Sequence, residues 1–284
     1  MNFNAIARLS RWDKPVGIWL LYFPCLWGLG LAWNGDLTAY IYYASLFFIG
    51  SVLLRSAGCI YNDLCDRDFD AKVERTAMRP LASGEISKKQ AIILIIFLCV
   101  CALPILFVLN NFARIVALGA IIPVALYPWM KRITYWPQLF LGITFNWGIL
   151  VGYAALQGRL DPAAGLLYMA AILWTLAYDT IYALQDIEDD MRIGVKSTAV
   201  LMQGSVHPMA LLCYVWMASI LVFLGVLQGF GMVYFGHMFV LSCLLLWQVL
   251  TLLSGDAQNA LARFKSNIWA GLIVSSALFM ETIL

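Results

Sequence analysis

Residues 39–70 read AYIYYASLFFIGSVLLRSAGCIYNDLCDRDFD, an apolar run that leads directly into a stretch with four aspartates. A bilayer core about 30 Å thick requires roughly 20 apolar residues for one helical crossing. Residues 39–61 are long and apolar enough for such a crossing, and the acids of residues 62–70 follow it at the membrane edge. This stretch therefore predicts a membrane helix with a charged end.

The whole chain has the composition of a membrane protein. Of its 284 residues 63% are hydrophobic and 12% are charged, whereas an ordinary soluble domain has about 25% charged residues. We expect an all-α, polytopic membrane protein: nine transmembrane helices in one bundle, with a central cavity capped by cytoplasmic loops, and a single domain over residues 1–284. The predicted spans are residues 16–34, 39–61, 89–109, 113–130, 138–157, 163–184, 208–227, 231–253 and 266–283.

The basic residues predict the orientation of these spans. Fifteen of the 18 Lys and Arg residues lie in the loops on the side of the N-terminus, and only Arg114 and Arg159 lie in the opposite loops. By the positive-inside rule, the N-terminus faces the cytoplasm. The first residues do not resemble a transit peptide, since three bases are accompanied by Asp13. We expect a bacterial inner membrane, with the mitochondrial inner membrane as the alternative.

The cysteines and histidines argue against two classes of site. Seven cysteines contain no C-x-x-C pair and are odd in number, which is untypical of a disulfide framework or a zinc site. The two histidines lie far apart in the chain and lack helical spacing. The formal net charge of +2 says little as a sum. We expect membrane lipid as a partner and no nucleic acid.

Two acidic stretches share one spacing. Asn62, Asp66 and Asp70 are four residues apart, so a continuing helix would place them on one stripe with steps of about 6 Å. Residues 182–190 repeat the spacing after the sixth predicted span, and the two halves of the chain look like a diverged pseudo-repeat. The members of the second stripe are Tyr182, Asp186 and Asp190, with Asp179 near the same face.

Two such stripes, if they face each other, form an all-oxygen site of the kind that Mg²⁺ prefers. The surrounding Arg and Lys residues are redundant for a bare ion but suit a polyanion such as diphosphate. Arg55 supports this interpretation because an arginine inside an apolar span is costly and usually functional. An ion or proton path through the bundle and a structural cluster of ion pairs remain as alternatives.

Five motifs follow one another along the chain. They are RWDKPVG at 11–17, NDLCDRDFD at 62–70, RTAMRPLASG at 75–84, YPWMKR at 127–132 and DTIYALQDIEDDMRIGVKST at 179–198. In these motifs the chain resembles the UbiA-type intramembrane prenyltransferases. The motifs occur in the family's order up to about residue 200, and the last 80 residues match only as hydrophobic helices.

The resemblance implies that a polyprenyl group passes from polyprenyl diphosphate to the ring carbon ortho to the hydroxyl of 4-hydroxybenzoate, in ubiquinone biosynthesis. The fourth and fifth motifs point to this acceptor. Homogentisate, a naphthoate or a tetrapyrrole are the alternative acceptors within the family, and a cation-coupled transporter is the alternative outside it. The cofactor expected is Mg²⁺.

These patterns assign a role to each candidate residue. The metal ligands predicted are Asp66, Asp70, Asp186 and Asp190, and the diphosphate-binding residues predicted are Arg55, Asn62, Arg75, Arg79 and Lys196. The family suggests Arg67 and Arg132 for the acceptor carboxylate, while Tyr127 and Tyr182 are expected to flank the allylic cation and Asp179 to act on the phenol or the ring proton.

Several of these residues have simpler explanations that the sequence leaves open. Arg75 and Arg79 also suit anchors for anionic lipid headgroups, the two tyrosines suit interfacial aromatic residues, and Asp179 suits a structural hydrogen bond. Lys131 and Arg192 are expected to be ordinary bases that follow the positive-inside rule. Four further acids lie off the two stripes and are expected either to contact the metal ligands or to face solvent: Asp63, Asp68, Glu188 and Asp189.

Overall fold

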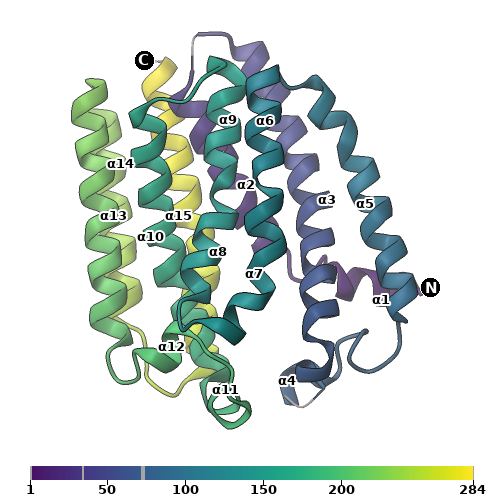
Figure 1. Cartoon of the computed structure of the whole chain (residues 1–284). Coiled ribbons are helices and arrows are strands. Elements are labelled where there is room, and N and C mark those ends of the chain that lie inside the picture. The colour runs from purple at the N-terminus through teal and green to yellow at the C-terminus, as the bar shows by residue number, and fades with distance from the viewer. Residues whose placement is uncertain (1, 34, 72–73, 284) are drawn as a thin grey trace.

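The computed structural model describes residues 2–33, 35–71 and 74–283, and all regular secondary structure in them is helical. The long helices run alongside one another in one bundle (Figure 1). They are α2 (Val16–Leu31), α3 (Leu37–Asp70), α5 (Lys88–Val108), α6 (Asn111–Gly119), α7 (Ile121–Ile133), α8 (Pro137–Phe145), α9 (Trp147–Gln157), α10 (Pro162–Ala183), α13 (Val206–Gln228), α14 (Met232–Leu250) and α15 (Ala257–Ile283).

The predicted spans coincide with these helices, and the all-α membrane fold is confirmed. Within the described residues, seven helical segments are long and apolar enough to cross a membrane. Three of the seven join successive helices: α6 with α7, α8 with α9, and α10 with the short helices that continue to Ile193. The first predicted span is the shorter apolar helix α2, and the ninth lies within α15.

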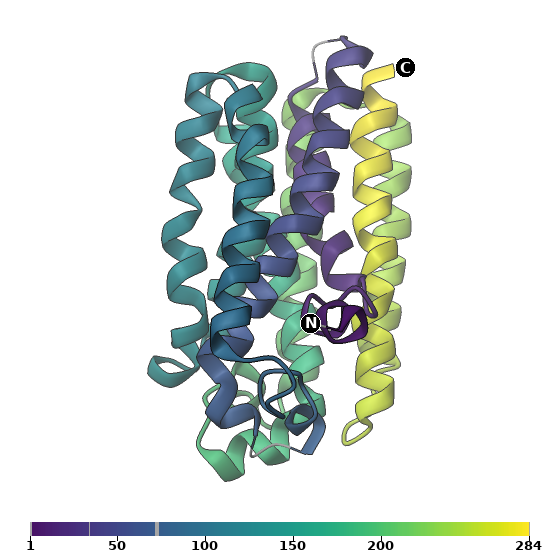
Figure 2. The ribbon, with the colours of Figure 1, turned by 90° about the vertical axis from the view of Figure 1, so that its right-hand side faces the viewer.

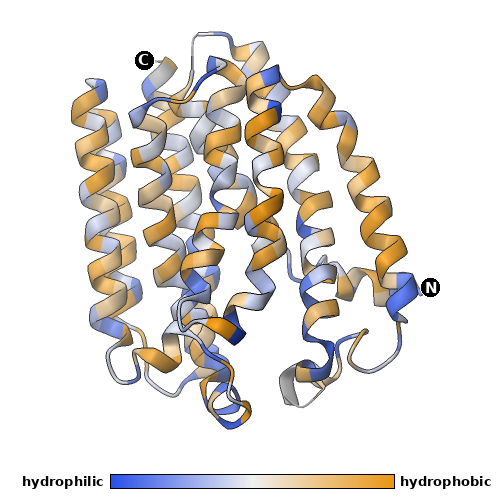
Figure 3. Cartoon of the chain, in the orientation of Figure 1, coloured by the Kyte–Doolittle hydropathy of each residue, from blue (hydrophilic) through white to orange (hydrophobic). Residues whose placement is uncertain are grey.

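Short helices gather near one end of the bundle, where the charged connections also lie (Figures 1 and 3). Figure 2 shows α1 crossing the long helices rather than running with them. Apolar side chains dominate the outer faces, as on α5, where Ile96 and Phe107 are more than half exposed. Such faces suit contact with lipid. The short elements are α1 (Phe3–Leu9), α4 (Glu74–Ala77), η1 (Leu184–Asp186), α11 (Ile187–Ile193) and α12 (Thr198–Leu201).

Local sequence signals explain where two of the long helices begin. Ser87 and Gln90 form a capping box at the start of α5, in which each side chain accepts a hydrogen bond from the backbone N–H of the other residue. Asp161 caps α10 by accepting from two backbone N–H groups, and Pro162 occupies the first helical position. These caps fix the ends of helices at opposite faces of the bundle.

The main core joins the first long helix to the last third of the chain. The buried indoles of Trp27 in α2 and Trp174 in α10 stack with centroids 5.0 Å apart. Both find hydrogen-bond partners on α15, because Trp27 Nε1 donates to the Gly271 carbonyl (3.1 Å) and Trp174 Nε1 donates to Asn267 Oδ1 (2.7 Å). The C-terminal helices therefore form the wall that holds α2 and α10 in place.

Helices α2 and α9 approach closely because glycines lie between them. A Cβ atom at Gly28 would lie 2.1 Å from the carbonyl oxygen of Ile149, and one at Gly152 would lie 2.5 Å from that of Cys25. Both contacts are with backbone, which cannot move aside as a flexible side chain does. Small residues at such crossings allow membrane helices to pack backbone against backbone.

Replacing Gly28 by alanine is expected to lower the free energy of unfolding by about 1–3 kcal/mol, since the new methyl group forces the two backbones apart. Thermal unfolding of the purified protein in detergent measures this loss. Gly236→Ala on α14 is the matched control, because nothing lies within 4 Å of its Cβ position. The control is expected to unfold at or slightly above the wild-type temperature. Equal unfolding temperatures for the two variants would contradict the close approach.

Candidate active site

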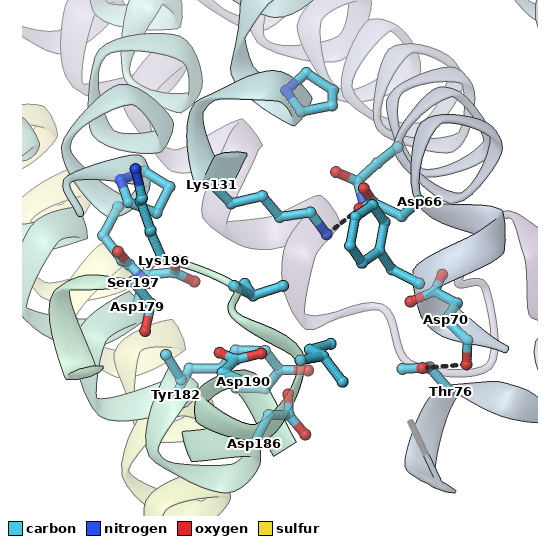
Figure 4. Close-up of a pocket in the computed structure, with 18 of the residues that line it drawn as sticks. Asp66, Asp70, Thr76, Lys131, Asp179, Tyr182, Asp186, Asp190, Lys196 and Ser197 are labelled. Carbon is cyan, nitrogen blue, oxygen red and sulfur yellow. Dashed lines mark hydrogen bonds and ion pairs between the residues drawn. The ribbon is translucent and has the colours of Figure 1, made fainter. Parts of the chain in front are cut away.

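One pocket at the charged end of the bundle brings together both acidic stretches (Figure 4). Its walls come from α3, from α7 with the start of α8, and from the segment that runs from α10 through α11. Most of the residues predicted from the sequence line it. These are Asn62, Asp66, Asp70, Arg79, Tyr127, Asp179, Tyr182, Asp186, Asp190 and Lys196.

The first acidic stripe lies on α3, which continues as one unbroken helix to Asp70. Asp66 is buried, and its Oδ2 pairs with Lys131 Nζ of α7 at 2.5 Å. Asp70 is also buried, and its Oδ2 accepts from Arg79 Nη1 at 2.8 Å. The hydroxyl of Thr76 donates to the Asp70 carbonyl (2.9 Å), which fixes the end of the helix. The predicted stripe is therefore present, and each of its carboxylates is paired with a base.

The second acidic stripe differs from a stripe on one continuing helix. Helix α10 ends at Ala183, a 3₁₀ turn covers residues 184–186, and α11 begins at Ile187. Tyr182, Asp186 and Asp190 thus belong to three successive elements, yet all of them line the pocket. A 3₁₀ turn has about 3.0 residues per turn instead of 3.6, so it redirects the chain between Tyr182 and α11.

Hydrogen bonds hold the segment after α11 against the start of α8. The backbone N–H of Lys196 donates to the Lys131 carbonyl (3.0 Å), and its ammonium donates to the Ile133 carbonyl (3.1 Å). Thr198 donates from both its backbone N–H and its hydroxyl to Gln138 Oε1 (2.9 and 2.8 Å). Gln138 is buried at the pocket wall. These contacts set the position of the second acidic wall relative to α7.

The acids that face each other across the pocket fit a hard divalent cation. Figure 4 shows Asp66 and Asp70 on one side and Asp186 and Asp190 on the other, with Lys131 reaching Asp66 from α7. Asp66 Oδ1 is buried and accepts no hydrogen bond from the residues that the structure describes, so it can serve as a donor atom to a ligand. Oxygen donors of this kind are those that Mg²⁺ prefers.

The two walls are not drawn together into a metal-binding geometry. Among the described residues, no group of three or more Asp, Glu, His or Cys side chains is close enough to hold a metal ion. Like charges repel strongly at a site of low dielectric. Lys131 and Arg79 each pair with an acid of α3. A cation between the walls would supply the attraction that brings them closer.

Several predicted residues lie outside the pocket lining. The Arg55 guanidinium lies over the Phe145 ring (4.8 Å), and its buried Nε has no hydrogen-bond partner within the described part of the chain. Arg67 Nε donates to the Leu81 carbonyl (3.1 Å). Arg132 donates to the Cys65 carbonyl (2.7 Å), and its Nη2 lies 3.7 Å from Asp66 Oδ1. The side chain of Arg75, at the start of α4, lies outside what the structure describes.

The pocket also contains a base that the sequence did not single out. Lys131 was expected to be an ordinary positive-inside residue, but it lines the pocket and pairs with Asp66. Its spacing contained the signal, because Lys131 follows Tyr127 by four residues on α7 and therefore lies on the same helical face. Asp63, which lies off the stripe, is also buried rather than solvated.

Comparisons with known proteins agree with the motifs. The model of the UbiA prenyltransferase family matches residues 21–271 of the chain. The mitochondrial 4-hydroxybenzoate polyprenyltransferase of Caenorhabditis elegans is 43% identical over 284 residues, which cover 100% of this chain and 80% of that protein. The 4-hydroxybenzoate octaprenyltransferase of Hydrogenovibrio crunogenus is 37% identical, with 99% and 98% covered.

Solved structures share the fold at lower identity. The apo structure of a UbiA homolog from Aeropyrum pernix superposes with a TM-score of 0.79 at 22% identity, covering 94% of this chain and 98% of that one. A UbiA homolog from Archaeoglobus fulgidus bound to GPP and Mg²⁺ gives a TM-score of 0.70 at 18% identity, covering 99% and 100%. The resemblance inferred from the motifs is confirmed, and the chain belongs to the UbiA prenyltransferase family.

Proposed function

We propose that this protein is a Mg²⁺-dependent 4-hydroxybenzoate polyprenyltransferase that acts in ubiquinone biosynthesis. The observation that carries the proposal is the pocket in which two acidic walls face each other at the end of an apolar bundle. Relatives about 40% identical over most of the chain bear the name of this enzyme in both animals and bacteria. The acceptor is inferred from these relatives, and the donor chemistry is inferred from the pocket.

The four pocket aspartates are the proposed metal ligands, two from each wall. Asp66 and Asp70 are carried by a rigid helix, whereas Asp186 ends the 3₁₀ turn and Asp190 lies in α11. When bound, Mg²⁺ offsets the charge of the leaving diphosphate as a Lewis acid. A UbiA homolog from Archaeoglobus fulgidus has been solved with GPP and Mg²⁺ bound, which supports this assignment.

The bases and amide at the pocket wall are the proposed diphosphate-binding groups. Arg79 and Lys196 line the pocket together with Asn62, and a guanidinium suits bidentate contact with phosphate oxygens. Lys131 is added to this group because its ammonium lies at the centre of the pocket beside Asp66 (Figure 4). Arg75 retains its predicted role, and Arg55 is proposed to act from deeper in the bundle.

The aromatic residues and Asp179 are proposed to serve the organic part of the reaction. Tyr127 and Tyr182 line the pocket, where the faces of their rings stabilise an allylic cation. The Tyr182 ring packs against Phe264 at 4.4 Å, which restricts its orientation. Asp179 lines the same pocket from α10 and is proposed to orient the phenol or accept the ring proton.

The acceptor carboxylate is assigned to Arg132, with Arg67 as a further predicted contact. The Arg132 guanidinium packs over the rings of Trp129 and Phe69 (4.7 and 5.0 Å) beside the pocket. This stacking leaves its edge available for a carboxylate. The role of Arg67 remains a prediction, since its Nε contacts the Leu81 carbonyl.

The proposed location is the bacterial inner membrane, with the N-terminus in the cytoplasm. An isoprenoid tail costs roughly 0.8 kcal/mol for each CH₂ exposed to water, so the donor remains in lipid. The exposed apolar faces of the helices suit that surrounding. The relatives include both bacterial and mitochondrial proteins, and the distribution of bases supports the orientation with a cytoplasmic N-terminus.

Membranes that contain this protein are expected to convert 4-hydroxybenzoate and a polyprenyl diphosphate into the ring-prenylated product with Mg²⁺ but not with EDTA. Product is measured by chromatography and mass spectrometry, and membranes without the protein are the control. Prenylation of another aromatic acceptor in place of 4-hydroxybenzoate would contradict the acceptor assignment alone. Activity that persists in EDTA would contradict the role of the metal.

Asp66→Ala and Asp186→Ala are each expected to lower the rate of prenylation at least about 100-fold, since each removes a proposed metal ligand. Asp189→Ala is the matched control, because Asp189 is adjacent to this acidic wall but pairs with Arg192 (2.7 Å) outside the pocket lining. The control is expected to retain near-normal activity. Normal turnover by either ligand variant, with equal amounts of protein in the membrane, would rule out the metal assignment.

A further inference from the structure

Asp63 is a buried acid that the proposed reaction does not use. It follows Asn62 on α3, and its side chain is only 1% exposed. It lies between two arginines from distant parts of the chain. Arg11 Nη2 donates to both of its oxygens (2.7 and 2.8 Å), and Arg79 Nη1 donates to Oδ1 (3.1 Å). A buried carboxylate with such partners is costly to leave unpaired.

Arg11 is held in an unusual conformation to make this contact. Its φ of 60° is the only positive value among the non-glycine residues that the structure describes, and L-residues rarely adopt that region. Its Nη1 also donates to the Arg8 carbonyl at the end of α1 (2.8 Å). A strained residue that persists in a fold is often maintained for a function.

Arg79 connects this pair to the pocket. The same Nη1 atom that donates to Asp63 also donates to Asp70 Oδ2 (2.8 Å), and Arg79 lines the pocket. The chain of contacts therefore runs from Arg11 through Asp63 and Arg79 to a proposed metal ligand. Asp63 and Asp70 share a single guanidinium, so a change at one of them alters how firmly the other holds it.

We propose that Arg11 and Asp63 are positioning residues that set how firmly Arg79 is held at the pocket wall. The proposal rests on the proposed function, because it concerns the binding of Mg²⁺ and of a diphosphate by this pocket. Arg11 donates to both oxygens of Asp63, so Asp63 holds Arg79 less firmly and leaves it available to the diphosphate. When a metal ion displaces Arg79 from Asp70, Asp63 still holds the Arg79 guanidinium at the pocket wall.

Substitutions of Arg11 and of Asp63 are expected to weaken the binding of different ligands. Without the Arg11 side chain, the buried Asp63 keeps its ion pair with Arg79 and withdraws that guanidinium from the diphosphate. With asparagine in place of Asp63, the Arg79 guanidinium pairs with Asp70 alone and competes there with Mg²⁺. A general loosening of the fold would weaken both ligands together in either variant.

The test measures binding without turnover, using thermal unfolding of the purified full chain in detergent. Mg²⁺ is titrated alone, and inorganic pyrophosphate is titrated at saturating Mg²⁺. Asp63→Asn is expected to raise the half-saturating Mg²⁺ concentration about tenfold, the size of one hydrogen bond between charged groups. Arg11→Gly, which keeps the left-handed backbone without strain, is expected to raise the half-saturating pyrophosphate concentration about tenfold and to leave that for Mg²⁺ within about twofold.

Arg8→Ala is the matched control. Arg8 pairs with Glu85 (2.5 Å) and so ties α1 to the same connection, but this pair is exposed and does not contact Arg79. The control is expected to bind both ligands as the wild type does. Arg11→Lys, which keeps a positive charge beside Asp63, is expected to restore most of the pyrophosphate affinity lost in Arg11→Gly.

Two results would overturn the proposal. Equal losses of pyrophosphate affinity in Arg8→Ala and Arg11→Gly would show that Arg11 only attaches the N-terminal segment to the bundle. Unchanged ligand binding in both Arg11→Gly and Asp63→Asn would show that Arg79 needs no positioning. A wild-type protein that binds both ligands but prenylates no 4-hydroxybenzoate would contradict the proposed function instead. The two failures are therefore distinguishable.

Discussion

The structure depends on the neutralisation of carboxylates that α3 carries into a region of low dielectric. An unpaired charge there costs several kcal/mol even after relaxation, so each acid requires a base, and each base comes from a different segment. This requirement ties the N-terminal segment, α7 and the loop after α4 to one helix. The pairs are Asp63 with Arg11, Asp66 with Lys131, and Asp70 with Arg79.

The same pairs keep the pocket ready for its proposed ligands. A metal ion and a diphosphate together bring charges of both signs, so each carboxylate and each base can exchange its present partner for a ligand. Lys131 and Arg79 would pass from acids to phosphate oxygens while the acids pass to the metal. Such an exchange changes the number of buried charge pairs little, and this limits its cost in free energy.

The sequence was sufficient for the fold and for the first acidic wall, because both follow from periodicity. Apolar runs of sufficient length predict spans, and the spacing of Asn62, Asp66 and Asp70 predicts a stripe on any straight helix. The second wall was only partly predictable, since nothing in residues 182–190 indicates the 3₁₀ turn that ends at Asp186. The burial of Asp63 was not predictable, because it depends on Arg11, 52 residues away in the chain.

The length of α3 places the pocket at the boundary between the aqueous phase and the lipid bilayer. Its 34 residues extend about 51 Å, well beyond a hydrocarbon core of about 30 Å. Residues 62–70 therefore reach the layer of lipid headgroups, where hydrated ions diffuse freely, whereas Arg55 lies about 10 Å deeper along the same helix. An ion from the aqueous phase and an amphiphile from the bilayer can thus meet at one helix end without either of them leaving its own phase.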